Sequence, residues 1–194
     1  KGIDVDIDAV YSGFLGAPEQ VDIIRDLYAT YPKALKVVDP VMVATSGAEL
    51  ATAATRKAME EQLLPLATLI TPNIPETEAL SGRAVESLED IRGAAKCLYD
   101  KFGAAVLIKG GHQTRNLGEA EDVLFDGSEY SSFSLPRIEN PISTHGTGCT
   151  LSAAIASELA LGRSLKDAIK GAKEYVYQAI KKSYLVGESC GVLS

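Results

Sequence analysis

Short apolar runs alternate along the chain with longer windows in which apolar residues recur every three or four positions. The runs have the length of strands and are apolar throughout, which is typical of strands covered on both faces of a sheet. The windows have the spacing of amphipathic helices. This alternation predicts an α/β fold with three layers (α/β/α) and a mainly parallel central sheet, formed by residues 1–194 as a single domain. The strand-like runs are Ala9–Phe14, Leu35–Val43, Ala67–Thr71 and Ala104–Lys109.

Helix and turn signals separate these runs. Pro18 suits the first turn of a helix, Gly82 suits the end of one, and Ser87 with Asp90 has the spacing of a capping box. The remaining expected elements are helices over Thr52–Leu64, Pro75–Leu80, Gly148–Leu161 and Leu165–Lys182, and a hairpin of Asp122–Phe125 and Tyr130–Leu135 around Asp126-Gly127. We expect the polar segment Gly111–Glu121 to be a mobile loop.

The strongest chemical signal is the turn Thr144–Thr150, which runs directly into an Ala-rich helix. Backbone N–H groups at a helix start lack partners within the helix, and glycines let an anion approach them closely. Gly146, Thr147 and Gly148 therefore predict a phosphate cradle, and Cys149 adds a thiol that ionises more readily at this end of a helix. The turn is no Walker A loop, because Cys149 stands where that loop has Lys. The alternative is a plain helix start with a buried cysteine.

Three further polar groups stand where strands are expected to end. Asp39 is a lone acid in an apolar run and needs a cation, a donor or a ligand, unless it only shapes the turn before Pro40. Asn73 and Glu76 have capping-box spacing, and the same pair suits a hydrated Mg²⁺ near phosphates. Lys109 with Gly110 and Gly111 forms either a strand-end turn or a contact to nucleotide phosphates.

Composition limits the partners and the compartment. A net charge of −7 argues against nucleic acid and anionic membranes as main partners, and no apolar run is long enough to span a bilayer. The three cysteines, Cys97, Cys149 and Cys190, are too few and odd in number for a disulfide framework, so we expect a cytoplasmic protein. Because the chain begins at Lys1 and enters a strand-like run almost at once, we expect it to be the later part of a longer protein.

Taken in order, these motifs resemble the ribokinase-like vitamin kinases, in the branch of hydroxymethylpyrimidine (phosphate) kinase and pyridoxal kinase. The resemblance spans nearly the whole chain, although the amino-terminal part of the family has no counterpart here. The matching segments are Val37–Met42 with Ser46-Gly47, Thr71–Glu76, Lys109–His112, Asp122–Leu124, Pro136–Ile138 and Thr144–Thr150.

The resemblance implies an ATP-dependent, Mg²⁺-dependent kinase that phosphorylates 4-amino-5-hydroxymethyl-2-methylpyrimidine and its monophosphate in thiamine biosynthesis. It implies that the amides from Gly146 to Cys149 stabilise the transferred phosphoryl group and that Cys149 is the general base. It further implies that Asn73 and Glu76 organise Mg²⁺ and that Asp39 lines the phosphate region. Thr71 and Lys109 would flank the nucleotide, and the intact protein would be a homodimer.

Several features leave the substrate and the activity open. The segment Tyr11–Gly16 is more similar to pyridoxal kinase, which makes that enzyme the alternative. Thr45 and Ser143 depart from the branch, which often has Lys and Asn there. Two other classes remain: a cysteine hydrolase that pairs Cys149 with His145 or His112, and a remnant that binds nucleotide without turnover.

Overall fold

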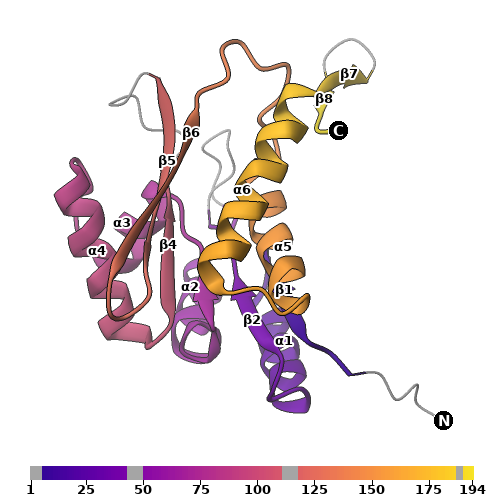
Figure 1. Cartoon of the computed structure of the whole chain (residues 1–194). Coiled ribbons are helices and arrows are strands. Elements are labelled where there is room, and N and C mark those ends of the chain that lie inside the picture. The colour runs from indigo at the N-terminus through magenta and orange to yellow at the C-terminus, as the bar shows by residue number, and fades with distance from the viewer. Residues whose placement is uncertain (1–5, 43–49, 111–117, 187–189) are drawn as a thin grey trace.

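A six-stranded sheet forms the centre of the structure, a computed structural model that describes residues 6–42, 50–110, 118–186 and 190–194 (Figure 1). The strands lie side by side in sequence order, and β1 to β4 are parallel. β5 runs antiparallel to both its neighbours, so β6 again points the same way as β4. The strands are β1 Ala9–Ser12, β2 Leu35–Val38, β3 Leu69–Ile70, β4 Ala105–Lys109, β5 Glu119–Phe125 and β6 Tyr130–Pro136.

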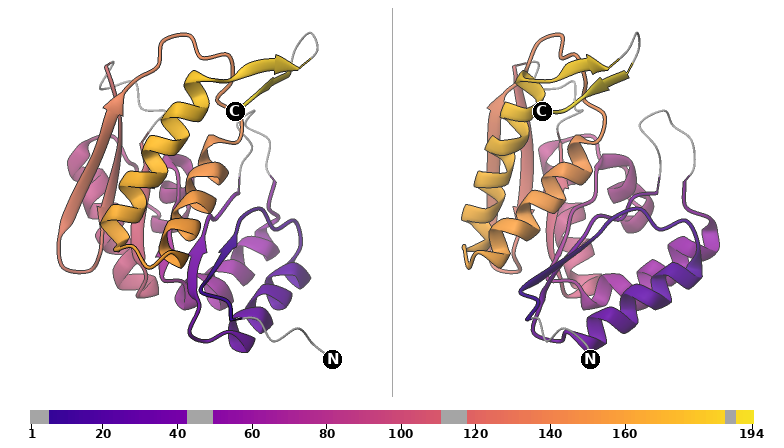
Figure 2. Two further views of the ribbon diagram at one scale, coloured as in Figure 1. Left: turned by 45° about the vertical axis from the view of Figure 1, so that its right-hand side comes forward. Right: turned by 90° about the vertical axis from the view of Figure 1, so that its right-hand side faces the viewer.

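Helices cover both faces of this sheet (Figures 1 and 2). Successive strand residues point to opposite faces. Val37 and Leu107 belong to a core shared with α5 and α6, whereas Val38 and Ile108 belong to a second core shared with the other helices. The three-layer α/β/α prediction is therefore confirmed. The helices are α1 Pro18–Thr30, α2 Ala53–Ala58, α3 Ile74–Ser81, α4 Leu88–Phe102, α5 Thr147–Ala160 and α6 Leu165–Lys181.

Local sequence signals account for several of these elements. Ser87 and Asp90 close a reciprocal capping box at the start of α4, and Gly82 ends α3 in the left-handed conformation that favours glycine. α6 buries a stripe at helical spacing, which includes Ile169 and Val176. The capping and periodicity predictions for these helices are confirmed.

Three segments differ from expectation. The single helix expected over Thr52–Leu64 is divided into α2, a π-helical turn at Met59–Leu63 and a 3₁₀ turn at Leu64–Leu66 that contains a proline. The expected loop over Gly111–Glu121 is wrong for its last three residues, because Glu119–Glu121 pair with β6 and so gain ladder hydrogen bonds despite their polarity. A carboxy-terminal hairpin of β7 Tyr184–Val186 and β8 Cys190–Val192 was not expected.

The topology brings the functional segments to one edge. β1 to β4 all end at the upper edge of the sheet in Figure 1, and α5 begins there. Strand-to-helix connections at such an edge are where α/β proteins bind ligands. In the part of the chain that the structure describes, no helix has both the length and the apolar character needed to cross a membrane.

Candidate active site

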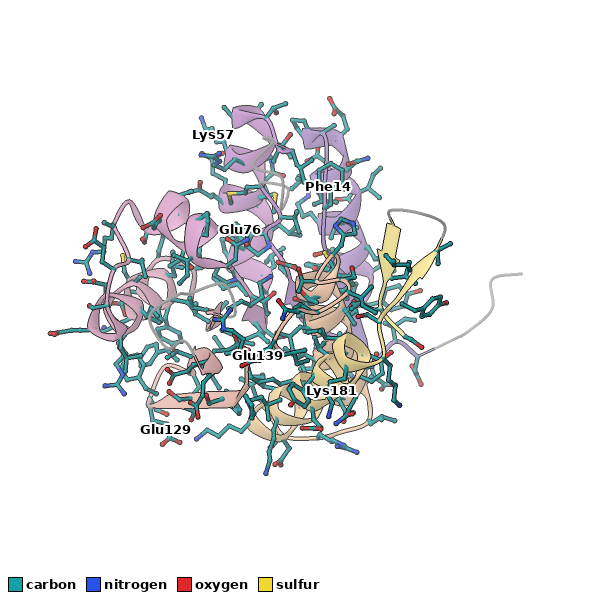
Figure 3. All side chains as sticks on the ribbon, turned by 90° about the horizontal axis from the view of Figure 1, so that it is seen from above. Phe14, Lys57, Glu76, Glu129, Glu139 and Lys181 are labelled. Carbon is teal, nitrogen blue, oxygen red and sulfur yellow. The ribbon has the colours of Figure 1, made fainter. Side chains whose placement is uncertain are left out.

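A cavity of about 910 Å³ opens at this edge of the sheet. Figure 3 looks down on it: Phe14, Glu76 and Glu139, which line the cavity, lie toward the middle of the molecule, whereas Lys57 and Glu129 lie at its periphery. Most of the residues expected to carry the chemistry share this cavity although they come from four different segments. They are Asp39, Asn73, Glu76, Lys109, Gly146, Thr147, Gly148 and Cys149.

Asp39, directly after β2, is almost fully buried, with 1% of its surface exposed. Its Oδ1 lies 2.7 Å from Lys109 Nζ, and its Oδ2 accepts a hydrogen bond from Ser152 Oγ at 3.3 Å. A buried carboxylate without a partner would be costly, and here both a cation and a donor are present. Asp39 therefore fixes the Lys109 ammonium at the floor of the cavity.

Asn73 and Glu76 form the capping box that their spacing also predicted. Glu76 Oε2 accepts from the Asn73 N–H at 2.8 Å, and Asn73 Oδ1 accepts from the Glu76 N–H at 2.9 Å. The box is unusual in its burial, because Glu76 is only 2% exposed and accepts a further, long hydrogen bond from the Met42 N–H at 3.4 Å. The pair thus caps α3 and at the same time faces the cavity.

The environment of Glu76 changes its protonation. Burial is the main cause that raises the pKa of Glu76 to about 7, and the nearby charge of Asp39 adds to the rise. The Lys109 ammonium and the two backbone N–H donors, from Asn73 and Met42, oppose it. A carboxyl whose pKa is shifted toward neutrality in a cavity is typical of a functional site. A cation that entered the cavity would favour the charged form of this carboxyl.

The end of β4 is locked by a second buried ion pair. The Gly110 N–H donates to Asp122 Oδ1 at 2.9 Å, and Asp122 Oδ2 lies 2.5 Å from Lys173 Nζ of α6. A Cβ at Gly110 would lie 2.2 Å from the Glu121 carbonyl oxygen, so the approach of β5 requires glycine at this position. These contacts hold the backbone at Gly110, directly after Lys109, against β5 and α6.

The start of α5 is left open. Gly146 is the N-cap residue, with φ +81°, and no side chain caps the helix, whereas Asn73, Ser87 and Ser164 cap α3, α4 and α6. A Cβ on Gly148 would lie 3.3 Å from Lys109 Nζ, so this ammonium lies beside the first turn. Uncapped amides and a cation at one helix start form a site that suits an anion such as phosphate.

Thr71 is placed behind the cavity wall. Its side chain is fully buried, and its hydroxyl lies 2.8 Å from Ser152 Oγ, which lies 3.1 Å from the Gly148 carbonyl oxygen and has that carbonyl as an alternative acceptor to Asp39. In this structure Thr71 therefore contacts α5 directly, and it would reach a nucleotide only through that helix start.

Some expected residues lie outside the described part of the chain, and some contributors were not expected. Gly111, His112 and the segment that contains Thr45, Ser46 and Gly47 are outside it. Ser152, Asp122 and Lys173 were not assigned roles from the sequence. The sequence offered a hint for Lys173, because this charged residue lies next to Ala172 in the apolar stripe of α6.

The fold and the site together define a ribokinase-like α/β protein. Residues 3–194 match the family model described as phosphomethylpyrimidine kinase. The chain belongs to the phosphomethylpyrimidine kinase family.

Relatives and solved structures agree with this assignment. The chain is 41% identical to the hydroxymethylpyrimidine/phosphomethylpyrimidine kinase of Haemophilus influenzae over 97% of this chain and 70% of that protein. It is 42% identical to the thiamine biosynthesis bifunctional protein ThiED of Geobacter sulfurreducens over 97% of this chain and 38% of that protein. The ADP complex of Bacillus subtilis pyridoxal kinase superposes with a TM-score of 0.85 at 37% identity, over 96% of this chain and 69% of that one. The chain thus spans about two thirds of single-function relatives and about two fifths of the bifunctional one.

Proposed function

We propose that the protein transfers a phosphoryl group from ATP to the hydroxymethyl group of 4-amino-5-hydroxymethyl-2-methylpyrimidine and to that compound's monophosphate. Family membership and the names of the most similar relatives support the reaction and the substrate. The observation that carries the proposal is the uncapped start of α5, with Lys109 beside Gly148 and Cys149 on the cavity wall. This arrangement provides donors for a phosphoryl group and a base for an alcohol in one turn.

Each residue has a role that follows from its position. Cys149 Sγ, which is exposed to the cavity, would take the proton from the acceptor hydroxyl. The backbone N–H groups from Gly146 to Cys149 would face the negative charge of the transferred group. Lys109 would neutralise nucleotide phosphates, while Asp39 keeps its ammonium in place. For Gly110 and Gly111 the proposed nucleotide contact rests on the resemblance alone, since the Gly110 N–H is bonded to Asp122 and Gly111 lies outside the described residues.

The residues present fit Mg²⁺ bound with ATP. Mg²⁺ usually keeps several waters and takes one or two protein carboxylates together with phosphate oxygens. Within the described residues, no group of three or more His, Cys, Asp or Glu side chains could hold a metal by itself. Of the buried carboxyls at the cavity, Asp39 and Asp122 are paired with lysines, whereas no lysine in the described part of the chain is paired with Glu76 within hydrogen-bond distance. Asn73 and Glu76 would therefore hold the hydrated ion rather than enclose it. When bound, Mg²⁺ would neutralise charge on the phosphates.

Pyridoxal kinase is the second candidate. Its support is specific: a solved structure that superposes closely is described as a pyridoxal kinase. The segment Tyr11–Gly16, of which Phe14 lines the cavity, also carries the resemblance to that enzyme noted in the sequence. A cysteine hydrolase has less support, because His145 directly precedes the turn of Cys149 in the chain rather than facing it from another element, and His112 lies outside the described residues.

The test offers the intact protein Mg-ATP with the pyrimidine alcohol and with pyridoxal in parallel, and follows ADP and both phosphorylated products. We expect turnover of the pyrimidine alcohol and of its monophosphate. Rapid turnover of pyridoxal without the pyrimidine would replace the proposal by the second candidate. Nucleotide binding without transfer to either acceptor would support a non-catalytic remnant.

We also propose that the intact protein is a homodimer. The proposal rests on the resemblance to the family and on the prevalence of two-fold assemblies among homo-oligomers. Light scattering that finds only monomer would contradict it.

A further inference from the structure

Ser152 places a fully buried hydroxyl on the apolar face of α5. It shares this face with Ile155 and Ala156, which belong to the core that α5 forms with the sheet. Alanine has nearly the same size as serine and a higher helix propensity, so packing does not require the hydroxyl. A buried hydroxyl is costly unless it is hydrogen-bonded, and this one has polar neighbours from three segments.

The protons of this network follow one order when Ser152 donates to Asp39. A hydroxyl carries a single proton. If the Ser152 proton lies toward Asp39 Oδ2, at 3.3 Å, the contact of 2.8 Å with Thr71 Oγ1 needs the Thr71 proton. The chain then runs from Thr71 through Ser152 to Asp39, whose other oxygen lies 2.7 Å from Lys109 Nζ. Hydrogen bonds in such a chain strengthen one another.

This chain also reaches the open start of α5. Ser152 Oγ lies 3.1 Å from the carbonyl oxygen of Gly148, one helical turn earlier. A Cβ on Gly148 would lie 3.3 Å from Lys109 Nζ, so the ammonium lies beside the same turn. Ser152 therefore joins, through Asp39, the two groups that would face a phosphate: the first turn of α5 and the Lys109 ammonium.

The other hydroxyls of α5 are bonded within the helix and the turn before it. Thr150 and Ser157 each donate to the carbonyl four residues earlier, at 2.8 Å and 3.0 Å. Thr147 donates to a carbonyl of the preceding turn at 2.9 Å. Ser152 has the same type of back-bond available, but it also contacts the ends of β2 and β3. Its hydroxyl thus ties the helix to the sheet, whereas that of Ser157 does not.

We propose that Ser152 is a positioning residue for phosphate binding: its hydroxyl, held by Thr71, fixes the start of α5 against the Asp39–Lys109 pair, so that the amides and the ammonium keep one spacing. The inference rests on the proposed function, because it assigns Ser152 to the phosphate region of that site. Neither Ser152 nor Thr71 would touch the nucleotide. Without the Ser152 hydroxyl, Asp39 keeps its ion pair and Thr71 keeps an acceptor in the Val38 carbonyl at 3.4 Å, so the fold should persist.

The test measures ADP affinity by calorimetry in the intact protein with Mg²⁺ and without an acceptor. We expect Ser152→Ala to weaken ADP binding about fivefold, the loss that one hydrogen bond typically causes. Ser157→Ala is the matched control, because it removes a back-bonded hydroxyl of the same helix, and it should bind ADP like the parent protein. We also expect Ser152→Ala to lower kcat about tenfold with little change in KM for the acceptor, which does not depend on this spacing.

A second background separates positioning from general damage to the fold. In a Lys109→Met protein, Ser152→Ala should weaken ADP binding by no more than about twofold, because the ammonium that the hydroxyl positions is gone. A loss of about fivefold in both backgrounds, or no loss in either, would overturn the proposal.

Thr71 decides the question if Lys109→Met does not fold. Thr71→Val removes the donor to Ser152 and Thr71→Ser keeps it, so we expect weaker ADP binding in the first variant and parent affinity in the second. Equal affinities in these two variants would contradict the proposed chain. If Ser152→Ala loses ADP affinity as expected but the parent protein phosphorylates no alcohol, the proposed function is rejected and the positioning role is retained. A parent protein without affinity for ADP would reject both.

Discussion

Helix starts in this protein are built in two ways. At the start of α4, which lies outside the cavity, Ser87 Oγ accepts from the Asp90 N–H at 3.0 Å and Asp90 accepts from the Ser87 N–H at 2.7 Å. At the cavity, α5 begins at Gly146 with no side-chain cap, and the cap of α3 depends on a carboxyl that is 2% exposed. In the first region, side chains of the box itself satisfy the Ser87 and Asp90 N–H groups, whereas the second region leaves donors and a buried acid facing a cavity.

The two capping boxes, at α3 and α4, have the same sequence motif but differ in burial, and this difference separates a capping role from a role in the site. A capping box needs only the two reciprocal hydrogen bonds, and the box of α4 has them at the surface. Burying Glu76 adds an energetic cost that capping does not require, and that cost is visible in its raised pKa. We infer that Glu76 of the α3 box contributes its charge to the site in addition to capping the helix, whereas Asp90 of the α4 box only caps its helix.

The largest expected effect is at the open start of α5. Cys149→Ala should slow phosphoryl transfer by about 10²-fold or more, as loss of a general base typically does. The side chain is exposed, so the fold and the affinity for ADP should change little. Steady-state kinetics, calorimetric ADP binding and thermal melting would be measured together. Turnover close to that of the parent protein would exclude Cys149 as the base and leave the backbone amides as the catalytic groups of this turn. Recovery of activity in Cys149→Asp would support a base at this position.

The second effect is on stability and comes from Glu76. Because its pKa is about 7 in the folded protein and 4.5 in the ordinary state, the folded state keeps a proton that the unfolded chain has lost. The resulting stabilisation is complete below about pH 4.5 and disappears as pH rises toward 7, a loss of up to about 3 kcal/mol. Urea unfolding across this range should show the decline, and Glu76→Gln should remove that part of it. An identical pH dependence in the variant would mean that Glu76 titrates normally.

The third effect separates the two boxes. Glu76→Gln should lower kcat about 10- to 100-fold and weaken the Mg²⁺ dependence of the rate, because it removes the charge near the phosphates. Gln can still close a capping box, so the free energy of unfolding at neutral pH should not fall by more than about 1 kcal/mol.

Asp90→Asn is the matched control, because it makes the same acid-to-amide change at the same position of the α4 box. It should cost about 1 kcal/mol of stability or less and leave kcat unchanged. If the Glu76 variant melts early but keeps its turnover, the two boxes are equivalent and the distinction between them fails.

Much of the fold followed from local sequence signals. The alternation of strand-like and helical segments gave the three layers, and Ser87 and Gly82 each marked a helix boundary because capping depends on neighbours in the chain. The division of the Thr52–Leu64 helix was not predicted, because the segment itself has a continuous helical pattern. Pro65, which follows it, has no backbone N–H to donate to the preceding turn. The strand at Glu119–Glu121 was missed because its stability comes from pairing with β6 rather than from its own residues.

The candidate site was predictable in its residue types but less so in its contacts. Strand ends and a glycine-rich helix start identified Asp39, Glu76 and Cys149, because parallel strands bring their carboxyl ends together. The partners were not predictable: Lys173 reaches Asp122 across 51 positions of sequence, and only packing of α6 brings them together. The direction in which Thr71 points, toward Ser152, likewise depends on how α5 lies on the sheet.

The most direct test of the central claim is amide hydrogen exchange with and without Mg²⁺ and ADP. The account predicts that the N–H groups of Gly146, Gly148 and Cys149 exchange rapidly in the free protein and about tenfold or more slowly with nucleotide, because bound phosphates would occupy them. Thr147 and Thr150 already donate to backbone carbonyls and are not part of the expectation. The start of α4, residues 87–91, should be unaffected, since it lies outside the cavity and its capping box already engages the Ser87 and Asp90 N–H groups. No slowing at α5, or equal slowing at both helix starts, would contradict the claim that the open helix start is the phosphate site.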